Sequence, residues 1–380
     1  MVEIKEVTTK TDLKKFIHFP NKLYEGNPYY VPALDMDELG MLDPAKNPAY
    51  EFCNVKCFLA YRDGKLCGRV AAILNKAYND VTGKKYMRFS RLDFTDDPEV
   101  VEALMGAVEQ YAREKGMDLV HGPLGFTDLD REGMLVEGFD KPGLYVTYYN
   151  HPYYPERLAG LGYAKDVDYV EYEIRPPKQE EAERLIKISD YIMKKLGLSL
   201  VPLKKMDDIK PFINGIFDLL NRAYSHLYGY VEITDKLRDA TVEQFFSLMK
   251  PEFLKVVLDA SGEVVAAALN APNISRACRK AKGRLFPFGI FHLLHDKNHP
   301  DVIDLYLIAV KPELQGKGVN AILLTESLKS IMEAGIGKAN ALPELETNNR
   351  VRDQWKNFDT AFTKRRRIFI KELQPGKQGS

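Results

Sequence analysis

The sequence predicts an α/β protein in which a mixed central sheet is flanked by helices. Two β-hairpins of similar pattern, at residues 57–74 and 253–269, support this prediction because each turns at a polar residue followed by glycine. Later in the chain each hairpin is followed by another apolar strand and an amphipathic helix, the alternation typical of α/β folds. The 380 residues, of which 45% are hydrophobic, are enough for two cores. We therefore expect two domains.

The expected joint between these domains is Arg175-Pro-Pro-Lys178, because consecutive prolines end a strand and stiffen a link. We place the first domain at residues 1–176, the second at 177–375 and a polar tail at 376–380. The first domain also contains a long irregular connection at residues 20–52. Connections of that length are uncommon unless they cover something.

Composition narrows the function classes. Acidic and basic residues balance at 54 each, so no overall field draws the protein to nucleic acid or to an anionic membrane. The charged N-terminus does not resemble a signal peptide, and no apolar run approaches the roughly 20 residues of a membrane span. The four cysteines are too few for a disulfide framework, so we expect buried thiols. These observations favour a cytoplasmic protein.

The most informative stretch runs from Asp304 to Leu324. An apolar, β-branched strand ends before Pro312, and apolar residues then return at helical spacing. Between them, Gly316 and Gly318 allow close backbone approach and turn amide groups outward. Outward amides at a helix N-terminus favour a pyrophosphate. A tight connection in which glycine only supplies an unusual dihedral is the competing interpretation.

The pattern Gln315-x-x-Gly318-x-Asn320 between this strand and helix resembles the acyl-CoA-binding motif of the GNAT superfamily of N-acetyltransferases. Asn320 departs from that motif, which has Gly or Ala there. The unit from Tyr154 to Ile174, a helix, Gly162-Tyr163 and an aromatic strand, resembles the end of a GNAT domain. The resemblance implies two tandem GNAT-like domains of a largely uncharacterised bacterial type. The first lacks the pyrophosphate loop, because the acidic run Thr95-Asp-Asp-Pro-Glu99 follows its strand.

The resemblance also implies acetyl-CoA or another acyl-CoA as co-substrate. The strand backbone would pair with the pantetheine arm, and the loop amides would hold the pyrophosphate. The residues expected to bind the cofactor are Ile308, Val310, Gln315, Gly316, Lys317, Gly318, Val319, Asn320 and Asn348.

The acid and base of such a transfer are less sharply marked. Asp304 and Tyr306 lie on the strand before the loop, and strict alternation places them on one face, so they are accepted or rejected together. Glu346, with Glu344, lies near the end of the next strand. We take Asp304, Tyr306 and Glu346 as catalytic candidates. Where many family members have a tyrosine acid, this chain has Trp355, whose indole donates a hydrogen bond but releases no proton.

Three other features have a plainer explanation than a binding site. His292, His295 and His299 could share a helical face, but three metal ligands need a completed set, so we expect no metal. The run Lys364–Arg367 could meet a phosphate but is more typical of a solvated strand edge. Five tyrosines between residues 145 and 154 could line a pocket, and we favour packing.

Three functions remain open. The first is an acyl-CoA-dependent N-acyltransferase that acts on a small-molecule or peptide amine. The second is a non-catalytic protein that binds acyl-CoA or another small ligand. The third is an aminoacyl transferase that uses charged tRNA, since paired GNAT domains occur in that enzyme class. We expect no nucleic-acid or membrane partner, and a monomer or homodimer.

Overall fold

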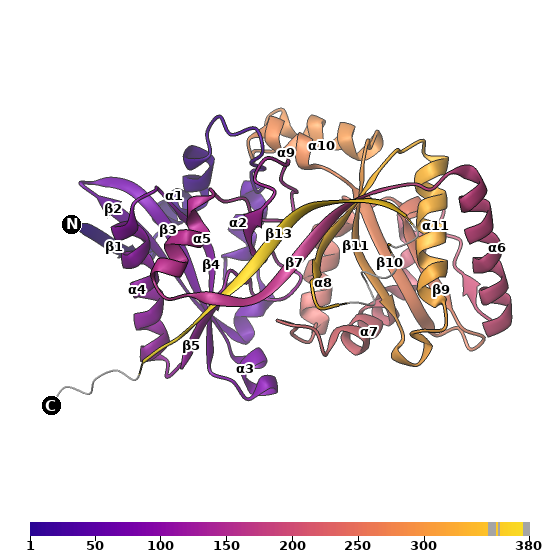
Figure 1. Ribbon diagram of the computed structural model, residues 1–380, viewed down its shortest axis with the longest axis horizontal. Coiled ribbons are helices and arrows are strands. Elements are labelled where there is room, and N and C mark those ends of the chain that lie inside the picture. Colours follow the sequence, from indigo (N-terminus) through magenta and orange to yellow (C-terminus); the bar gives the residue numbers. More distant parts are fainter. Residues whose placement is uncertain (349–354, 356–357, 375–380) are drawn as a thin grey trace. The chain divides into compact units, whose positions relative to one another are not determined.

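The computed structural model describes residues 1–348, 355 and 358–374, and the chain divides into two compact units (Figure 1). The first unit comprises residues 1–169, 277–290 and 364–380; the second comprises 170–276 and 291–363. Both units are discontinuous in sequence, whereas the expected domains are continuous. Strands β7 (Ala164–Arg175) and β13 (Asp359–Glu372) each contribute residues to both units.

The first unit is built on the strand order β1-β2-β3-β4-β5-β13, with β6 paired to β13. All its neighbours are antiparallel except β4 and β5. Its other elements are β1 (Val2–Glu6), α1 (Lys10–Leu23), α2 (Asp35–Met41), β2 (Cys53–Arg62), β3 (Lys65–Asn75), α3 (Lys76–Thr82), β4 (Tyr86–Phe94), α4 (Pro98–Glu114), β5 (Leu119–Gly122), β6 (Met134–Glu137) and α5 (Tyr153–Gly160).

The second unit has the order β7-β12-β11-β10-β9-β8, in which β11 and β12 are parallel. Its elements are α6 (Gln179–Leu196), β8 (Ser199–Leu200), α7 (Ile213–Tyr224), α8 (Asp235–Phe246), β9 (Leu254–Leu258), β10 (Val264–Pro272), α9 (Ser275–Ala281, mostly in the first unit), α10 (Gly289–Asn298), β11 (Ile303–Val310), α11 (Val319–Glu333) and β12 (Ala339–Leu345). The predicted mixed sheet flanked by helices is confirmed.

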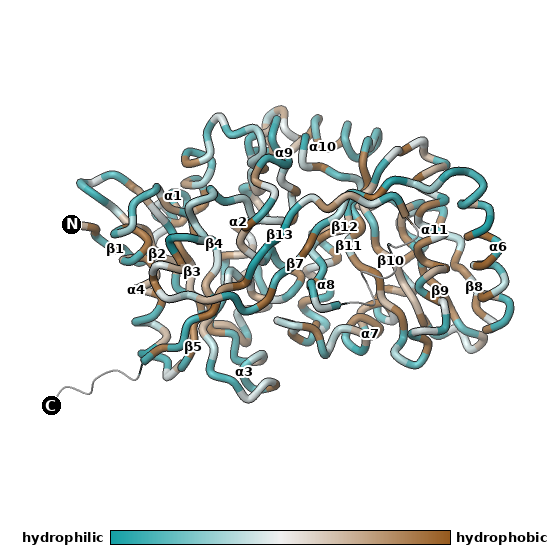
Figure 2. Tube along the Cα trace, viewed as in Figure 1, coloured by the Kyte–Doolittle hydropathy of each residue, from teal (hydrophilic) through white to brown (hydrophobic). Residues whose placement is uncertain are grey.

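Each unit packs a helix on its sheet through buried apolar side chains. In the first unit α4 covers β3 with Val101, Leu104 and Val108, all at most 1% exposed. The contact is close: a Cβ on Gly68 would lie 2.7 Å from Leu104 Cδ1. In the second unit α11 buries Ile322 among residues of β10 and α6. Figure 2 shows the apolar strands in brown between the helices.

Local sequence misled us at two places. The connection at residues 20–52 is not wholly irregular, because it contains α2 and a 3₁₀ turn at Pro48–Glu51. The run Lys364–Arg367 is not a solvated edge: it lies within β13, where Lys364 and Arg366 are buried. Arg365 and Arg367 bind Asp168, whose carboxylate lies 3.5 and 2.8 Å from them. The buried Asp168 carboxylate thus balances part of the charge of this run.

The cysteine prediction is confirmed. All four are free and buried, and burial raises the pKa of the Cys53 and Cys57 thiols to about 12. Such thiols stay protonated at neutral pH and are poor nucleophiles. Among the residues described, no helix is long and apolar enough to cross a bilayer.

Candidate functional site

The glycine turn between β11 and α11 has the geometry that the sequence predicts. Gly316 and Gly318 adopt φ of 75° and 86°, and Gly318 caps the helix. A Cβ on Gly318 would also lie 2.7 Å from Ile192 Cδ1 on α6. Conformation and packing both require glycine at position 318.

Some amides of this turn donate to backbone carbonyls within it, those of Gln315 and Lys317, and others do not. Within the described part of the chain, the N–H groups of Gly316, Gly318 and Val319 have no hydrogen-bond partner. They lie at the N-terminus of a 15-residue helix, where the helix dipole adds positive potential. Lys317 is exposed beside them, and Asn320 is half-buried in the first turn. The arrangement suits a phosphate-bearing ligand.

Strands β11 and β12 separate immediately before this turn. Their parallel ladder joins only Ile303–Leu305 to Ala339–Ala341. Pro343 follows two residues later in β12, and proline has no N–H to continue a ladder. Residues 305–308 of β11 are accordingly half-buried, between buried ends of the strand. The separation opens one edge of β11 toward β12.

A β-bulge lies at the start of the separation. Leu269 on β10 pairs with Leu307, and Asn270 pairs with Leu305, so Tyr306 is the extra residue. A bulge interrupts the alternation of side chains. Alternation therefore does not place Asp304 and Tyr306 on a common face, and each side chain has its own surroundings. The Tyr306 ring lies edge-on to Phe245, with centroids 6.1 Å apart.

Asp304 is occupied by structural contacts. It is 1% exposed, and the Asn273 side-chain amide donates to both its carboxylate oxygens at 2.9 Å. The Asn340 amide donates to Oδ1 at 2.7 Å. These bonds tie β11 to β12 and to the end of β10. The contacts favour a structural role for Asp304.

The open edge of β11 is contacted by two side chains. The Tyr224 hydroxyl, at the end of α7, donates to the Ile308 carbonyl at 3.0 Å and accepts from the Ile308 N–H at 3.3 Å. The Gln315 side-chain amide donates to the Val310 carbonyl at 3.1 Å. Ile308 and Val310 thus present their backbone groups on the same side, as expected for residues two apart in a strand. A ligand that pairs with Ile308 has to displace the Tyr224 hydroxyl.

Glu344 lies on the separated part of β12 and is the best placed proton acceptor. Burial raises the pKa of its carboxyl to about 7, although the hydrogen bond from Trp355 acts in the opposite direction. The Trp355 indole N–H lies 2.9 and 3.1 Å from the two carboxylate oxygens. Trp355 packs with Leu305 and Ile308, so it brings Glu344 to the open edge of β11.

The remaining predicted residues lie at the end of this strand. Glu346 and Asn348 follow β12 in a turn, where the Asn348 amide donates to the Leu345 carbonyl at 2.9 Å. The sequence also predicts a short helix at residues 346–358, and most of that segment lies outside the described residues. Glu344 was noted in the sequence but ranked below Glu346, because sequence spacing does not show which carboxylate is buried.

The corresponding turn of the first unit, between β4 and α4, is closed to anions. The Asp97 carboxylate caps α4 by accepting from the Glu99 N–H at 3.0 Å. Asp96 and Asp97 in turn bind Arg157 and Arg62, each at 2.8 to 2.9 Å. That the first domain lacks a pyrophosphate loop stays a prediction.

The chain has clear structural and sequence relatives, although no protein-family model matches it. A tandem GNAT protein from the clavulanic acid biosynthesis pathway superposes with a TM-score of 0.59, over 99% of this chain and 100% of that one, at 12% identity. A GCN5-related glucosamine N-acetyltransferase region of a fungal multi-domain β-N-acetylglucosaminidase gives 0.55, over 98% of this chain and 38% of that one, at 13% identity. The chain has the fold of the GCN5-related N-acetyltransferases.

Two sequence relatives align with nearly the whole chain. Protein YghO from Escherichia coli (strain K12) is 27% identical over 97% of this chain and 95% of its own length. A protein named bacterial ceramide synthase, from Caulobacter vibrioides (strain NA1000 / CB15N), is 27% identical over 97% of this chain and 96% of its own. The predicted resemblance to the GNAT fold is confirmed.

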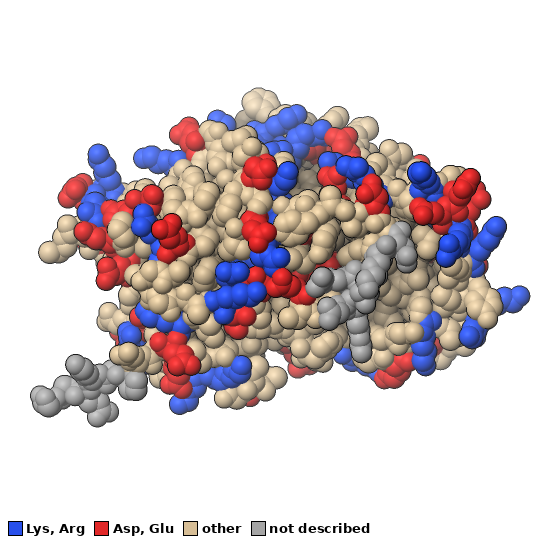
Figure 3. Space-filling view, in the orientation of Figure 1, with Lys and Arg blue, Asp and Glu red and all other residues tan. Residues whose placement is uncertain are grey.

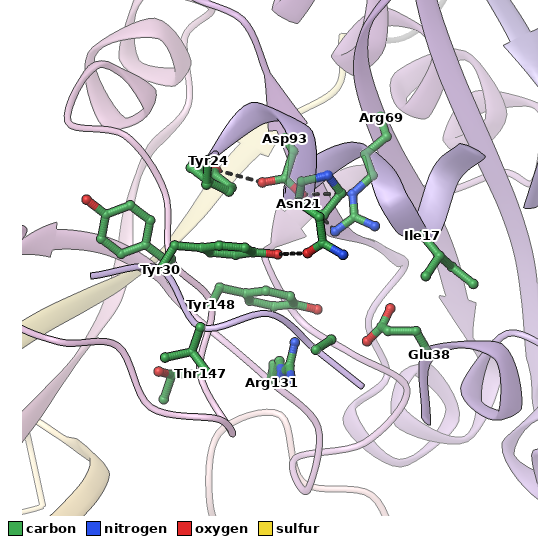
Figure 4. Close-up of a pocket in the computed structure, with 14 residues that line it drawn as sticks. Ile17, Asn21, Tyr24, Tyr30, Glu38, Arg69, Asp93, Arg131, Thr147 and Tyr148 are labelled. Carbon is green, nitrogen blue, oxygen red and sulfur yellow. Dashed lines mark hydrogen bonds and ion pairs between the residues drawn. The ribbon is translucent and has the colours of Figure 1, made fainter. Parts of the chain in front are cut away.

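The first unit contains a charged cavity that sequence reasoning missed (Figure 4). Its volume is about 30 Å³, which is room for about two water molecules. Ion pairs border it: Arg69 lies 2.8 Å from Asp93, and Arg91 lies 2.7 Å from Glu38. Although burial opposes ionisation, Arg91 and then Arg131 hold the pKa of Glu38 at about 2.

Arg131 differs from the other cations of this cavity. Its guanidinium lies over the Tyr145 ring at 5.3 Å and has no carboxylate within 4.0 Å among the residues described. Tyr148 and Tyr149 also line the cavity, whereas Tyr153 and Tyr154 bind the Phe94 backbone. Some tyrosines of the cluster thus line the cavity, and others pack against the strand, so both interpretations of the cluster apply.

The histidines on α10 do not form a metal centre in the described structure. The His295 and His299 rings lie 5.0 Å apart, but no group of three His, Cys, Asp or Glu side chains that could hold a metal occurs among the described residues. The expectation that the protein uses no metal stays a prediction.

Proposed function

We propose that this protein is an acyl-CoA-dependent N-acyltransferase whose co-substrate binds at the β11–α11 turn of the second unit. The observation that carries the proposal is the turn itself. Its outward amides at Gly316, Gly318 and Val319 adjoin a strand edge that Pro343 leaves open. A GNAT fold with both features has a place for a pyrophosphate and for an extended pantetheine arm.

Glu344 is the proposed general base. Its pKa of about 7 lets the carboxylate accept a proton from an amine at neutral pH. The amine nitrogen attacks the thioester carbonyl and loses a proton to Glu344 as the C–N bond forms; the C–S bond breaks, and CoA leaves as the thiolate. Trp355 holds Glu344 in place through its indole N–H. Tyr306, at the bulge, stays our candidate for protonating the thiolate.

The acceptor we propose is a long-chain amino alcohol. Support comes from the Caulobacter vibrioides relative, whose name is bacterial ceramide synthase and which aligns over 97% of this chain. A ceramide is an amide between such an amino alcohol and a fatty acid, so its formation is an N-acyl transfer. A fatty acyl-CoA is accordingly the proposed donor, with acetyl-CoA as the short-chain comparison.

A test of the reaction measures free thiol released from acetyl-CoA and palmitoyl-CoA in the presence of separate amines. The panel contains a long-chain 2-amino alcohol, its short-chain analogue, an amino sugar and a lysine peptide. We expect release only with an acceptor present, and the fastest release with palmitoyl-CoA and the long-chain amino alcohol. Absence of release with every pair would contradict the proposed activity.

A second candidate is a protein that binds acyl-CoA without transferring the acyl group. Two observations favour it: Asn320 replaces the small residue of the motif, and the Tyr224 hydroxyl engages Ile308 at the strand edge. Calorimetric binding of palmitoyl-CoA without release of thiol for any acceptor would establish this alternative. Thiol release that follows saturation kinetics in the acceptor would exclude it.

A further inference from the structure

The exposed apolar side chains of this protein are concentrated in one short segment. Ten large apolar residues are exposed among those described, and four of them lie within nine residues of sequence: Phe286, Phe288, Phe291 and Leu294. Phe286 and Phe288 are each 72% exposed. Clustered exposed aromatic residues indicate an interaction surface, whereas single ones need no explanation.

Basic residues lead directly into this segment. Lys280, Lys282 and Arg284 are exposed, and the two lysines have no carboxylate within 4.0 Å in the described part of the protein. The nearest acid to Arg284 is Asp35, at 4.0 Å, which also binds His18 at 3.0 Å. Figure 3 shows lysine and arginine side chains gathered at the top of the view, over α9. We call residues 280–288 the basic-aromatic tip.

The tip belongs to the first unit and is firmly held there. Arg279 donates to the Pro28 carbonyl at 2.8 Å, and the Asp35 N–H donates to the Gly283 carbonyl at 2.9 Å. Gly283 has φ of 78°, and a Cβ there would lie 2.5 Å from the Ala33 carbonyl oxygen. The exposed phenylalanines are therefore displayed by a fixed turn. Ala33 also lines the charged cavity, so the tip adjoins that cavity.

The helix that follows continues the pattern along the chain. On α10, Phe291 and Leu294 are exposed while Leu293 is buried. Residues three apart share a helix face, so Phe291 and Leu294 form an apolar pair on the outward side of this helix, which also carries the exposed His295 and Asn298. Aromatic and aliphatic side chains beside several lysines and arginines are the composition of segments that lie in the headgroup region of a bilayer.

We propose that the basic-aromatic tip docks this protein on the surface of an anionic lipid bilayer. Phe286 and Phe288 enter the boundary between headgroups and acyl chains, and Lys280, Lys282 and Arg284 contact lipid phosphates. The zero net charge of the chain conceals this local cationic surface. The described residues contain no helix able to span a membrane, so the attachment proposed is peripheral. It does not depend on acyl transfer.

Vesicle co-sedimentation of the full-length protein tests the proposal directly. The vesicles are phosphatidylcholine alone, or phosphatidylcholine with roughly 30% phosphatidylglycerol, an anionic lipid. We expect partitioning onto the anionic vesicles that weakens as salt rises from about 0.1 M to about 0.5 M, because exposed charges are screened. Each lysine or arginine near the surface contributes about a fivefold preference.

Two variants separate the apolar and charged contributions. We expect F286S/F288S to lower partitioning onto both kinds of vesicle. K280Q/K282Q/R284Q should lower it at least tenfold on anionic vesicles only. The matched control is Y191S/K194Q/K195Q on α6, where Tyr191 is 65% exposed, and it should partition as wild type. Thermal melting confirms that each variant is folded.

Three results would overturn the proposal: no partitioning of the wild type, equal partitioning of the wild type and both tip variants, or loss in the control as well. If light scattering shows that wild type is a dimer and F286S/F288S a monomer, the tip contacts a second copy of the chain, and the membrane proposal fails. None of these measurements uses CoA, so they leave the proposed acyl transfer untouched.

Discussion

Each unit has a turn that leads from a strand into a helix: β4 to α4 in the first unit and β11 to α11 in the second. The two turns differ in the group that caps the N-terminus of the helix. In the first unit Asp97 caps the helix, and Arg62 neutralises that carboxylate. In the second, Gly318 caps the helix and supplies no side chain. An internal carboxylate satisfies one helix end, whereas the other has no side-chain cap, which is why we propose it as the anion site. In the same fold, a helix N-terminus can thus be capped by a side chain of the protein or left uncapped and available to a ligand.

The parallel strand pairs of the two units diverge in the same way. The β4–β5 ladder ends at His121 and the β11–β12 ladder at Ala341, and a proline follows each by two residues, Pro123 and Pro343. In the first unit the opened strand is bound by Tyr154, which contacts both the N–H and the carbonyl of Phe94. Tyr224 does the same to Ile308 in the second. The two units therefore share the way in which their parallel strands separate, and they differ in the turn that follows the first strand of each pair.

The largest effect should come from removing the proton acceptor of the second unit. E344Q keeps an acceptor for the Trp355 indole but cannot take a proton, so we expect the turnover rate to fall by about 10²- to 10⁴-fold. Wild-type turnover should rise with pH through about 7, as Glu344 ionises. Stopped assays over roughly two pH units on either side of 7 measure the turnover rate of E344Q and the pH dependence of the wild-type rate.

The same shift affects stability with a definite sign. The folded pKa of Glu344 lies above the ordinary value of 4.5, so its contribution is complete below about pH 4.5 and is lost as pH rises through about 7. E344Q should lack this loss.

The identity of the base is tested by comparing two variants. If E346Q abolishes turnover and E344Q does not, Glu346 is the base.

A large loss of stability, without a loss of cofactor affinity, is expected from R91M in the first unit. It leaves the buried Glu38 carboxylate without its closest partner, which costs about 3–5 kcal/mol. Urea unfolding measures the loss, and calorimetry with CoA checks that affinity is kept. The double variant E38M/R91M, which removes both charges, should recover most of the stability; failure to recover would mean that Arg91 acts through other contacts.

In wild type, the Glu38–Arg91 pair should also make stability depend on acidity. The folded pKa of Glu38 is about 2, below the ordinary value of 4.5. Its stabilisation is therefore complete above about pH 4.5 and is lost as pH falls toward 2. E38M/R91M should show less acid destabilisation over this range.

The two tyrosines offer a closer comparison of the open strand edges. Y154F removes the hydroxyl that accepts from the buried Phe94 N–H, whereas the Phe94 carbonyl keeps its hydrogen bond from the Tyr153 hydroxyl. It should lower stability by about 1–3 kcal/mol without changing CoA affinity. Y224F should cost less, because its site is only partly buried, and should tighten acyl-CoA binding severalfold by freeing Ile308. Thermal unfolding measures the stability of both variants, and calorimetry measures their affinity for acyl-CoA. Equal effects on affinity would contradict the assignment of the cofactor to the second unit.

The smallest effect should follow from D97A at the capped turn. Loss of the side-chain cap of α4 costs about 1 kcal/mol. It should not create a CoA site, because Asp96 and Glu99 keep the turn acidic and still pair with Arg157 and Arg62. Urea unfolding gives the stability change, and a loss well above 2 kcal/mol would show that Asp97 does more than cap the helix.

The sequence was informative where contacts are local. The strand, the two glycines and the helix of the β11–α11 turn adjoin in the chain, so their pattern predicted the turn. It could not show that Glu344 is half-buried against Trp355, because that depends on how two strands separate. The charged cavity was missed for a related reason: its ion pairs join residues 24 to 53 positions apart. The bulge at Tyr306 breaks the alternation on which the analysis of β11 relied.

The central claim is that the glycine turn of the second unit holds the CoA pyrophosphate. Titration calorimetry with CoA compares wild type, G318A and D97A. A Cβ at position 318 would meet Ile192 at 2.7 Å on a backbone with φ of 86°, so G318A should weaken binding at least tenfold while D97A binds as wild type. Equal affinity of wild type and folded G318A, or loss of binding in D97A alone, would contradict the claim.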